Sequence, residues 1–247
     1  MDTKDTKLTC WHLNHGAQLA PFGGYRMPLW YTSGPIREHR AVLESAGLFD
    51  TSHMAEILIE GPNSHDLLQQ VLTKDLERCL GGHPLEPGRA TYGFLLTPEG
   101  HLLDDAIVLQ EERDVYLLVV NAGMGPAVSA HLLAAGAELD VTVSDMTGRL
   151  AKLDLQGPKS LDILRKALKP HPKLRSPIPY FGFVGHYDHL QQGICSTLGF
   201  PVLVSRTGYT GEFGFELFVR PCDFVRFWEQ LLEVGREDGL IPCGLGA

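Results

Sequence analysis

An internal repeat is the feature that most restricts the fold of this 247-residue chain. The stretches ILIEGPNSHDLLQQVL (residues 57–72) and LDLQGPKSLDILRKAL (residues 153–168) share six of 16 positions, at a separation of 96 residues. Each has the pattern of a short strand, a Gly-Pro turn and an amphipathic helix. The repeat therefore predicts one strand–turn–helix unit used twice, and the alternative is chance recurrence of a common pattern.

The segments that follow the two copies also correspond. Hairpin-like strands are predicted at residues 91–96 with 103–109 and at 193–197 with 201–205, and each pair precedes a further strand and a closing helix. The closing helices are expected near residues 125–135 and 222–235. Helices that return onto mostly antiparallel strands make an α+β architecture, and two such units side by side would form a cleft.

Composition excludes several function classes. Lys and Arg number 21 against 30 Asp and Glu, and this net charge of −9 argues against nucleic acid as a partner. No apolar stretch approaches the roughly 18 residues of a membrane span, and the first residues, MDTKDTKLTC, lack a signal-peptide core. The five cysteines include no C-x-x-C pair, so neither a disulfide framework nor a zinc site is expected. His186 and His189 are the nearest approach to a metal motif, and they are more typical of a solvated loop.

The stretch GHLLDDAIVL (residues 100–109) places two adjacent carboxylates in an apolar run. Apolar residues occupy both parities, so the pattern predicts a strand that is buried on both faces. Successive strand side chains point to opposite faces, and Asp104 and Asp105 therefore cannot share one role.

The stretch SRTGYTGEFGFEL (residues 205–217) is the second candidate for a site. Its glycines favour tight turns that would present Arg206, Tyr209 and Glu212 around one spot, and the alternative is a Gly-rich hairpin loop with solvated polar residues. The sequence lacks a complete phosphate loop, a G-x-S-x-G elbow and a G-x-G-x-x-G fingerprint. Nucleotide hydrolysis, serine-hydrolase chemistry and dinucleotide binding therefore lose their usual support.

Taken together, PFGGYRMPLWY, EHRAVLESAGLFDTSHM, GHLLDDAIVL, VVNA, QGP and SRTGYTGEFGFEL resemble, in this order and spacing, the glycine cleavage system T-protein family. The resemblance runs from about residue 13 to the last residue. It implies a folate cleft formed by two related units, one made of residues 1–53 and 148–247 and the other of residues 54–147 with the Asp-Asp strand. Members of the family continue past GLGA into a barrel-like domain that is absent from this sequence.

The resemblance implies a tetrahydrofolate-dependent aminomethyltransferase, which takes the aminomethyl carbon from the lipoyl arm of H-protein and releases ammonia. Asp105 would face the folate and assist proton movement, whereas Asp104 would satisfy backbone amides of the turn. Glu212 would accept hydrogen bonds from the donor edge of the pterin ring, and Arg206 would have a structural role in the same motif. The remaining cofactor-binding positions would be Tyr92, Met54, Ile107, Asn121 and Tyr180. The expected location is the bacterial cytoplasm, or the mitochondrial matrix of a eukaryote.

Three positions depart from the family pattern. His101 stands where the motif usually has glycine, Phe213 where an aspartate commonly follows the glutamate, and Thr51 where valine is usual. His101 and Phe213 lie beside the predicted pocket and motivate an alternative, a folate-dependent demethylase that acts on another small donor. The missing domain motivates another, a non-catalytic folate-binding module.

Overall fold

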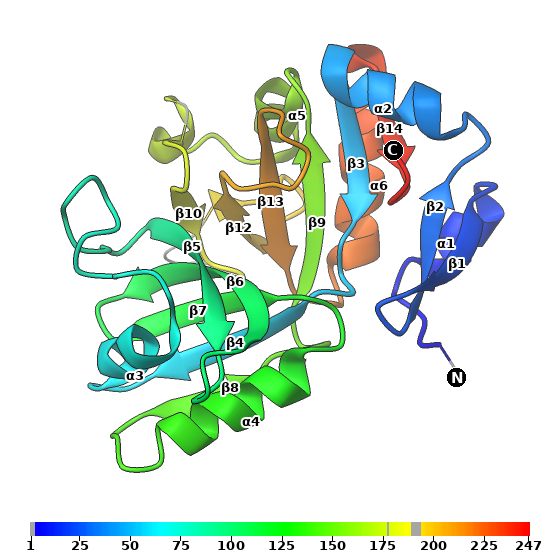
Figure 1. Ribbon diagram of the computed structural model, residues 1–247. Coiled ribbons are helices and arrows are strands. Elements are labelled where there is room, and N and C mark those ends of the chain that lie inside the picture. Colours follow the sequence, from blue (N-terminus) through cyan, green and yellow to red (C-terminus); the bar gives the residue numbers. More distant parts are fainter. Residues whose placement is uncertain (1–2, 177, 189–193) are drawn as a thin grey trace. The chain divides into compact units, whose positions relative to one another are not determined.

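The computed structural model describes residues 3–176, 178–188 and 194–247, and it divides into two compact units (Figure 1). Unit 1 comprises Met1–His53 and Arg149–Ala247, and unit 2 comprises the inserted segment Met54–Gly148. Each unit combines a mainly antiparallel sheet with helices, so the predicted α+β fold is confirmed. Over the described part of the chain, no helix combines the length and apolar character that a membrane span requires.

Unit 1 contains both ends of the chain. Its helices are α1 (Thr9–Asn14), α2 (Pro35–Glu44), α5 (Ser160–Ala167) and α6 (Phe224–Gly235), with 3-10 turns η1 (Pro172–Leu174) and η2 (Arg236–Asp238). Its strands are β1 (Gln18–Phe22), β2 (Tyr25–Trp30), β3 (Ala46–Asp50), β9 (Ala151–Gln156), β10 (Phe183–Gly185), β11 (Ile194–Cys195), β12 (Pro201–Ser205), β13 (Gly214–Val219) and β14 (Leu240–Cys243). The closing helix α6 begins two residues later than predicted.

The larger sheet of unit 1 has the strand order β10-β12-β13-β9-β3-β14, with β11 also paired to β12. Neighbouring strands are antiparallel, except that β14 pairs with β3 in parallel. The central pair β9 and β13 runs through the middle of the unit, and β1 and β2 form a separate hairpin (Figure 1). The structure therefore places β9, which contains the second copy of the repeat, at the centre of the sheet.

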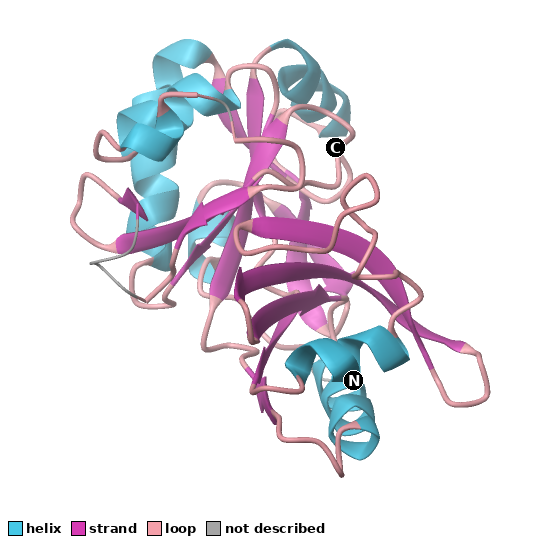
Figure 2. Ribbon diagram, turned by 90° about the vertical axis from the view of Figure 1, so that its left-hand side faces the viewer, coloured by secondary structure: helices cyan, strands magenta, loops and turns pink. Residues whose placement is uncertain are grey.

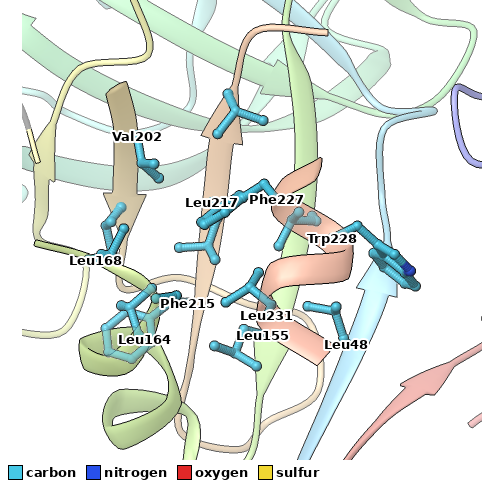
Figure 3. Packing of buried hydrophobic residues seen from close by; sticks show 14 of the residues in the cluster. Leu48, Leu155, Leu164, Leu168, Val202, Phe215, Leu217, Phe227, Trp228 and Leu231 are labelled. Carbon is cyan, nitrogen blue, oxygen red and sulfur yellow. The ribbon is translucent and has the colours of Figure 1, made fainter. Parts of the chain in front are cut away.

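Helices α5 and α6 cover one face of this sheet and form its hydrophobic core (Figure 3). Helix α6 buries Phe224, Phe227, Trp228 and Leu231, and this i, i+3, i+4, i+7 spacing places them on one side of the helix. Leu155 of β9 and other buried residues of the sheet pack against these helix side chains. Burial of each such side chain contributes about 1.5–3 kcal/mol to stability.

Unit 2 repeats this two-layer design with a smaller sheet. Its elements are β4 (Ala55–Glu60), α3 (Ser64–Val71), β5 (Arg89–Leu96), β6 (Leu102–Glu112), β7 (Val115–Val120), α4 (Gly125–Ala135) and β8 (Thr142–Asp145). The strand order is β5-β6-β7-β4-β8, and every pair is antiparallel. Helices α3 and α4 pack together on one face of the sheet (Figure 2).

The two glycines shared by the repeat explain why the pattern recurs. Gly61 follows β4 and Gly157 follows β9, with φ values of 128° and 125°, which side chains rarely adopt. A Cβ at Gly61 would lie 2.4 Å from the Asp140 carbonyl oxygen, and one at Gly157 would lie 2.6 Å from that of Ser45. The same turn then leads into a helix in both units, so the repeat is structural.

The prediction that the Asp-Asp strand is buried on both faces is wrong for the part of the strand around Asp105. Ala106 and Val108 of β6 are buried in the core beneath the helices, but on the other face Asp105 and Ile107 are only half-buried, although Leu109 farther along this face is buried. The apolar residues on this second face were compatible with burial, because sequence alone does not show what covers a sheet. One face of β6 therefore belongs to the core and the other is accessible near Asp105.

A buried hydrogen-bond network holds the N-terminal helix of unit 1 to β3. Asp50, the last residue of β3, accepts hydrogen bonds from His12 Nε2 at 3.0 Å and from Thr6 Oγ1 at 2.8 Å. Ser52 donates to its other oxygen from both its backbone amide and its hydroxyl. Burial alone would raise the pKa of Asp50, but the hydrogen bonds and the positive charge of His12 hold that pKa below its ordinary value.

Asp50→Ala should destabilise unit 1 strongly. The change leaves the donors of buried His12 and of half-buried Thr6 and Ser52 without their acceptor, which costs about 3–5 kcal/mol. Asp5→Ala is the control, because its ion pair with Arg26 lies at the surface, and this variant should unfold like the wild type. The measurement is urea-induced unfolding at neutral pH, and equal stability of the two variants would contradict the proposed role of the network.

His53 is a buried titratable group whose protonation affects stability below neutral pH. Its ring is 4% exposed and packs at 5.5 Å, centroid to centroid, from Phe22. Burial, opposed by the negative charge of Asp50 and aided by the positive charge of Lys152, lowers the pKa of His53 to about 4. The folded chain therefore holds His53 neutral in a range where the unfolded chain protonates it.

The free energy of unfolding should fall as the pH decreases from 6.5 to about 4. In this window the unfolded state gains a proton on His53 that the folded state does not bind, at a cost of up to about 3 kcal/mol. His53→Gln should flatten this part of the stability profile, whereas His39→Gln on the exposed surface of α2 should preserve it. Urea unfolding at a series of pH values measures both, and an unchanged slope in His53→Gln would exclude His53 as the cause.

Candidate functional site

The pleat of β6 separates the two adjacent aspartates in unit 2. Asp104 lies on the face that packs against the helices and is 8% exposed, whereas Asp105 lies half-buried on the other face. Phe94 of β5 pairs with Asp105, and Tyr92 pairs with Ile107. The exposed side of this hairpin thus presents a carboxylate among two aromatic rings and an aliphatic side chain.

Asn121 holds the two carboxylates next to each other. It directly follows β7, whose last residue Val120 pairs with Ala106. The Asn121 side-chain nitrogen Nδ2 donates to Oδ1 of Asp104 at 2.7 Å and to Oδ1 of Asp105 at 2.5 Å. Its backbone amide donates to Oδ2 of Asp104 at 3.0 Å. The Asn121 amide nitrogen therefore bridges the two carboxylates. Its hydrogen bonds reduce the repulsion between their negative charges.

The role predicted for Asp104 needs correction in its detail. We expected it to satisfy amides of the turn before the strand, but it accepts the amide of Asn121, which follows β7. The turn at residues 97–100 is closed instead by its own bonds, including Gly100 N to Thr97 O at 2.8 Å. Asp104 thus stabilises the end of the neighbouring strand and, through it, the position of Asn121.

Tyr92 completes the surroundings of Asp105. Its hydroxyl donates to Oδ2 of Asp105 at 2.8 Å, so each carboxylate oxygen has one donor. The Tyr92 ring meets Phe94 edge to face at 5.6 Å, and the two residues are 44% and 42% exposed. Both donors are neutral and each carboxylate oxygen has a second lone pair, so Asp105 can still accept a proton or a hydrogen bond from a ligand.

The structure brings five of the predicted site residues to one part of unit 2. Besides Asp105, Tyr92, Asn121 and Ile107, this group includes Met54, which immediately precedes β4. The first residue of β4, Ala55, pairs with Val120, so Met54 lies at the same end of the sheet as Asn121. Met54 and Ile107 are both half-buried.

The other three predicted residues belong to loops of unit 1. Arg206 Nη1 donates to the Ile178 carbonyl oxygen at 2.9 Å, and the guanidinium lies 4.5 Å from the centroid of the Phe213 ring. The Arg206 backbone also exchanges hydrogen bonds with Phe181 and Gly182. Arg206 therefore joins the segment before β10 to the segment after β12. Tyr180 and Glu212 lie in these two segments, and both are exposed.

A buried ionic cluster in unit 1 was missed in the sequence. Lys152 of β9 donates to Oδ1 of Asp154 at 2.7 Å and to Oε1 of Glu216 in β13 at 2.6 Å. Burial would lower the pKa of Lys152, but the two carboxylates raise it above its ordinary value. Burial and the negative charge of Glu216 raise the pKa of Asp154 despite the adjacent ammonium group.

This cluster supports the loop that contains Glu212. Oε2 of Glu216 accepts a hydrogen bond from the Thr207 hydroxyl, and Thr207 is the residue after Arg206. The alternation of Lys152, Asp154 and Gln156 along one strand was the signal in the sequence, because it places three polar side chains on the face opposite α5 and α6. No group of side chains suited to a metal ion is found among the described residues, and His189 lies outside them.

The chain matches the GCVT N-terminal domain over residues 8–247. It belongs to that family. This match confirms the resemblance to the T-protein that the motifs indicated.

Curated relatives and a solved structure agree with the GCVT assignment. An aminomethyltransferase of Chlorobium luteolum is 39% identical over 99% of this chain and 62% of its own length. One of Moorella thermoacetica is 40% identical over 100% of this chain and 62% of its own length. The crystal structure of glycine cleavage system aminomethyltransferase T from Bartonella henselae has a TM-score of 0.82 at 30% identity, covering 99% of this chain and 60% of that one. The chain therefore spans about three-fifths of the length of these relatives.

Two departures from the family motif have identifiable surroundings in this GCVT domain. His101 is exposed and closes the turn before β6, where its carbonyl oxygen accepts the Thr97 amide at 2.8 Å. Phe213 packs against the core of unit 1 and meets Phe215 edge to face at 5.4 Å. Phe213 also supports the Arg206 guanidinium, so its aromatic ring has a packing role.

Lys152→Met should destabilise the GCVT domain because it leaves Asp154 and Glu216 buried without a counter-charge. We expect a loss of about 3–5 kcal/mol in the free energy of unfolding. Lys166→Met is the matched control, since Lys166 pairs with Asp238 at the surface, and it should unfold like the wild type. A triple variant with Asp154→Leu and Glu216→Leu added to Lys152→Met should recover stability, and its failure to do so would show that the cluster acts by shape and not by charge.

Proposed function

We propose that this chain is the folate-binding part of a tetrahydrofolate-dependent aminomethyltransferase of the glycine cleavage system. The observation that supports it best is the position of Asp105, which is held by Tyr92 and Asn121 on an accessible, partly aromatic face. Membership of the GCVT family and the names of the curated relatives point to the same activity. A carboxylate fixed beside exposed rings suits a flat ligand that presents N–H donors.

The proposed reaction transfers one carbon without a change in oxidation state. Two bonds form, one from each of two folate nitrogens to the aminomethyl carbon carried on the lipoyl arm of H-protein, and the bonds from this carbon to its amino nitrogen and to sulfur break. Each of the two folate nitrogens loses one hydrogen. One of these hydrogens completes the released ammonia, and the other completes the lipoyl thiol. Tetrahydrofolate supplies the nucleophile, and the protein has to orient it and to move protons.

Asp105 is assigned the proton-handling role in this proposal. Hydrogen bonds to both of its oxygens fix the carboxylate plane, so a folate nitrogen that approaches this carboxylate would meet an acceptor in a defined direction. Because neither donor is a cation, the negative charge of Asp105 would remain to favour the cationic character of an attacking amine. Asn121 acts through Asp105 and is therefore a positioning residue.

The remaining assignments concern binding. Glu212 would accept paired hydrogen bonds from the aminopyrimidine edge of the pterin, and Tyr92, Ile107, Met54 and Tyr180 would supply apolar and aromatic contact surface. Arg206 would hold the Glu212 loop in place through Ile178 and Phe213. Lipoylated H-protein is the expected protein partner, and the bacterial cytoplasm is the expected location, given bacterial relatives.

A binding titration tests the folate assignment. The chain should bind tetrahydrofolate in isothermal titration calorimetry, and Asp105→Asn should weaken binding by about tenfold or more, since a hydrogen bond to a charged group contributes about 1.5–3 kcal/mol. Glu112→Gln removes the same charge from the exposed end of β6 and should bind like the wild type. Equal binding by both variants would exclude Asp105 from the site.

Carbon transfer tests the reaction itself. Isotopically labelled aminomethyl-H-protein should transfer its carbon to tetrahydrofolate in the presence of the protein, and Asp105→Asn should abolish most of that transfer. Transfer only from another methylated small molecule would favour the demethylase alternative. Tetrahydrofolate binding without turnover from any donor would favour the binding-module alternative.

A further inference from the structure

Positive charge is concentrated in one short segment of unit 1. Residues 165–175, RKALKPHPKLR, contain five of the 21 Lys and Arg residues together with His171, and no Asp or Glu. The whole chain has a net charge of −9, so this segment has the opposite sign to the protein around it. Such a local reversal attracts anions and repels the cations that the rest of the surface favours.

The segment forms a pocket of about 420 Å³ at the C-terminal end of α5. Arg165, Lys169, His171 and Arg175 line it, with Pro170, Pro172 and Leu174 between them. The lining contains no carboxylate. A concave site of this size accommodates a small molecule.

Hydrogen bonds from Arg165 fix the shape of the pocket. Its Nε and Nη2 donate to the Leu174 carbonyl oxygen at 3.1 and 3.0 Å, and Nη2 also donates to that of Arg175 at 3.0 Å. The Lys169 amide donates to the Cys195 carbonyl oxygen at 2.8 Å. The rings of Pro170 and Pro172 further restrict the backbone on either side of His171. The chain therefore holds these charges together before any ligand arrives, which lowers the entropic cost of binding.

His171 contributes a donor in its neutral form. Its Nδ1 accepts a hydrogen bond from the Lys173 amide at 3.3 Å, where it caps η1. The ring proton of neutral His171 is thereby assigned to Nε2. Arg165, by contrast, uses most of its donors on backbone carbonyls and acts mainly as a fixed positive charge.

Stabilisation of the helix end explains only part of this segment. Arg165 and Lys166 lie in the last turn of α5, where cations interact favourably with the helix dipole. Lys166 also pairs with Asp238, and Arg165 lies 3.7 Å from Asp162. Lys169 and Arg175 lie beyond the helix, and neither has an ion pair with any part of the chain that the structure describes.

We propose that this pocket binds a small polyanion, a molecule with two or more phosphate or carboxylate groups. Lys169, Arg175 and His171 would contact the anionic groups, and Arg165 would hold the loop and add a fixed charge. This site goes beyond the proposed folate chemistry, since it uses none of the residues assigned to folate.

Calorimetric titration at low ionic strength tests the proposal, with pyrophosphate and tricarballylate as probes of the two possible anion chemistries. One equivalent of at least one probe should bind, and Lys169→Gln with Arg175→Gln should weaken its binding about tenfold or more. The matched control is Arg37→Gln with Arg40→Gln on the exposed surface of α2, which removes the same charge and should bind within about twofold of the wild type. The probe that binds more tightly identifies phosphate or carboxylate as the preferred group.

Amide shifts in the NMR spectrum give a second readout on the unaltered chain, and they should move at residues 165–175 on addition of the bound probe. Absence of binding by both probes would overturn the proposal, as would equal weakening in the two variant pairs. Tetrahydrofolate binding should be unaffected by the Lys169→Gln, Arg175→Gln pair, and pyrophosphate binding should be unaffected by Asp105→Asn. Failure of this site and failure of the folate assignment are therefore distinguishable.

Discussion

The alternation of side chains across a strand is the constraint on which both units depend. In β9, Leu153 and Leu155 enter the core beneath α5 and α6, so Lys152 and Asp154 must lie on the opposite face. In β6 the same rule buries Ala106 and Val108 and turns Asp105 to the accessible side. Each sheet thus devotes one face to stability and leaves the other for polar groups. A shift of one residue in register would exchange the two faces, and the hydrophobic core opposes such a shift.

Buried and partly buried charges are stabilised differently on the two polar faces. In unit 1 a lysine lies between two carboxylates, and the cluster is almost wholly buried. Removal of water from these groups is costly, so the cluster persists only because each charge has a close partner. In unit 2 the carboxylates are satisfied by an amide and a phenol, which are neutral. Asp105 also keeps contact with solvent, so its charge is tolerated without a counter-ion.

Local sequence patterns predicted most of the elements, because turns and helix faces depend on neighbouring residues. The Gly-Pro repeat, the closing helix α4 and the hairpin β5–β6 follow from such patterns, and they appear where expected. The exposure of the second face of β6 did not follow, since cover comes from distant segments. The cluster of Lys152 and Glu216 was missed for the same reason: these residues are far apart in sequence, and pairing of β9 with β13 brings them together. Asn121 was found only through the family resemblance, although its contacts explain its position.

The chemical difference between the two faces indicates which acid can act on a ligand. Asp154 already neutralises Lys152 and is buried, so a ligand would have to displace an internal ion pair to reach it. Asp105 is restrained by hydrogen bonds from the Tyr92 hydroxyl and the Asn121 amide, which are both neutral donors, and it is accessible. Rigid placement without charge neutralisation is the property that a general base or an amine-binding group requires.

The same argument separates Asp105 from Asp104, its neighbour in sequence. The amide and side chain of Asn121 hold both oxygens of Asp104, which lies on the core side. Two adjacent and chemically identical residues thus differ in burial and in hydrogen-bond partners because the strand pleat gives them different surroundings.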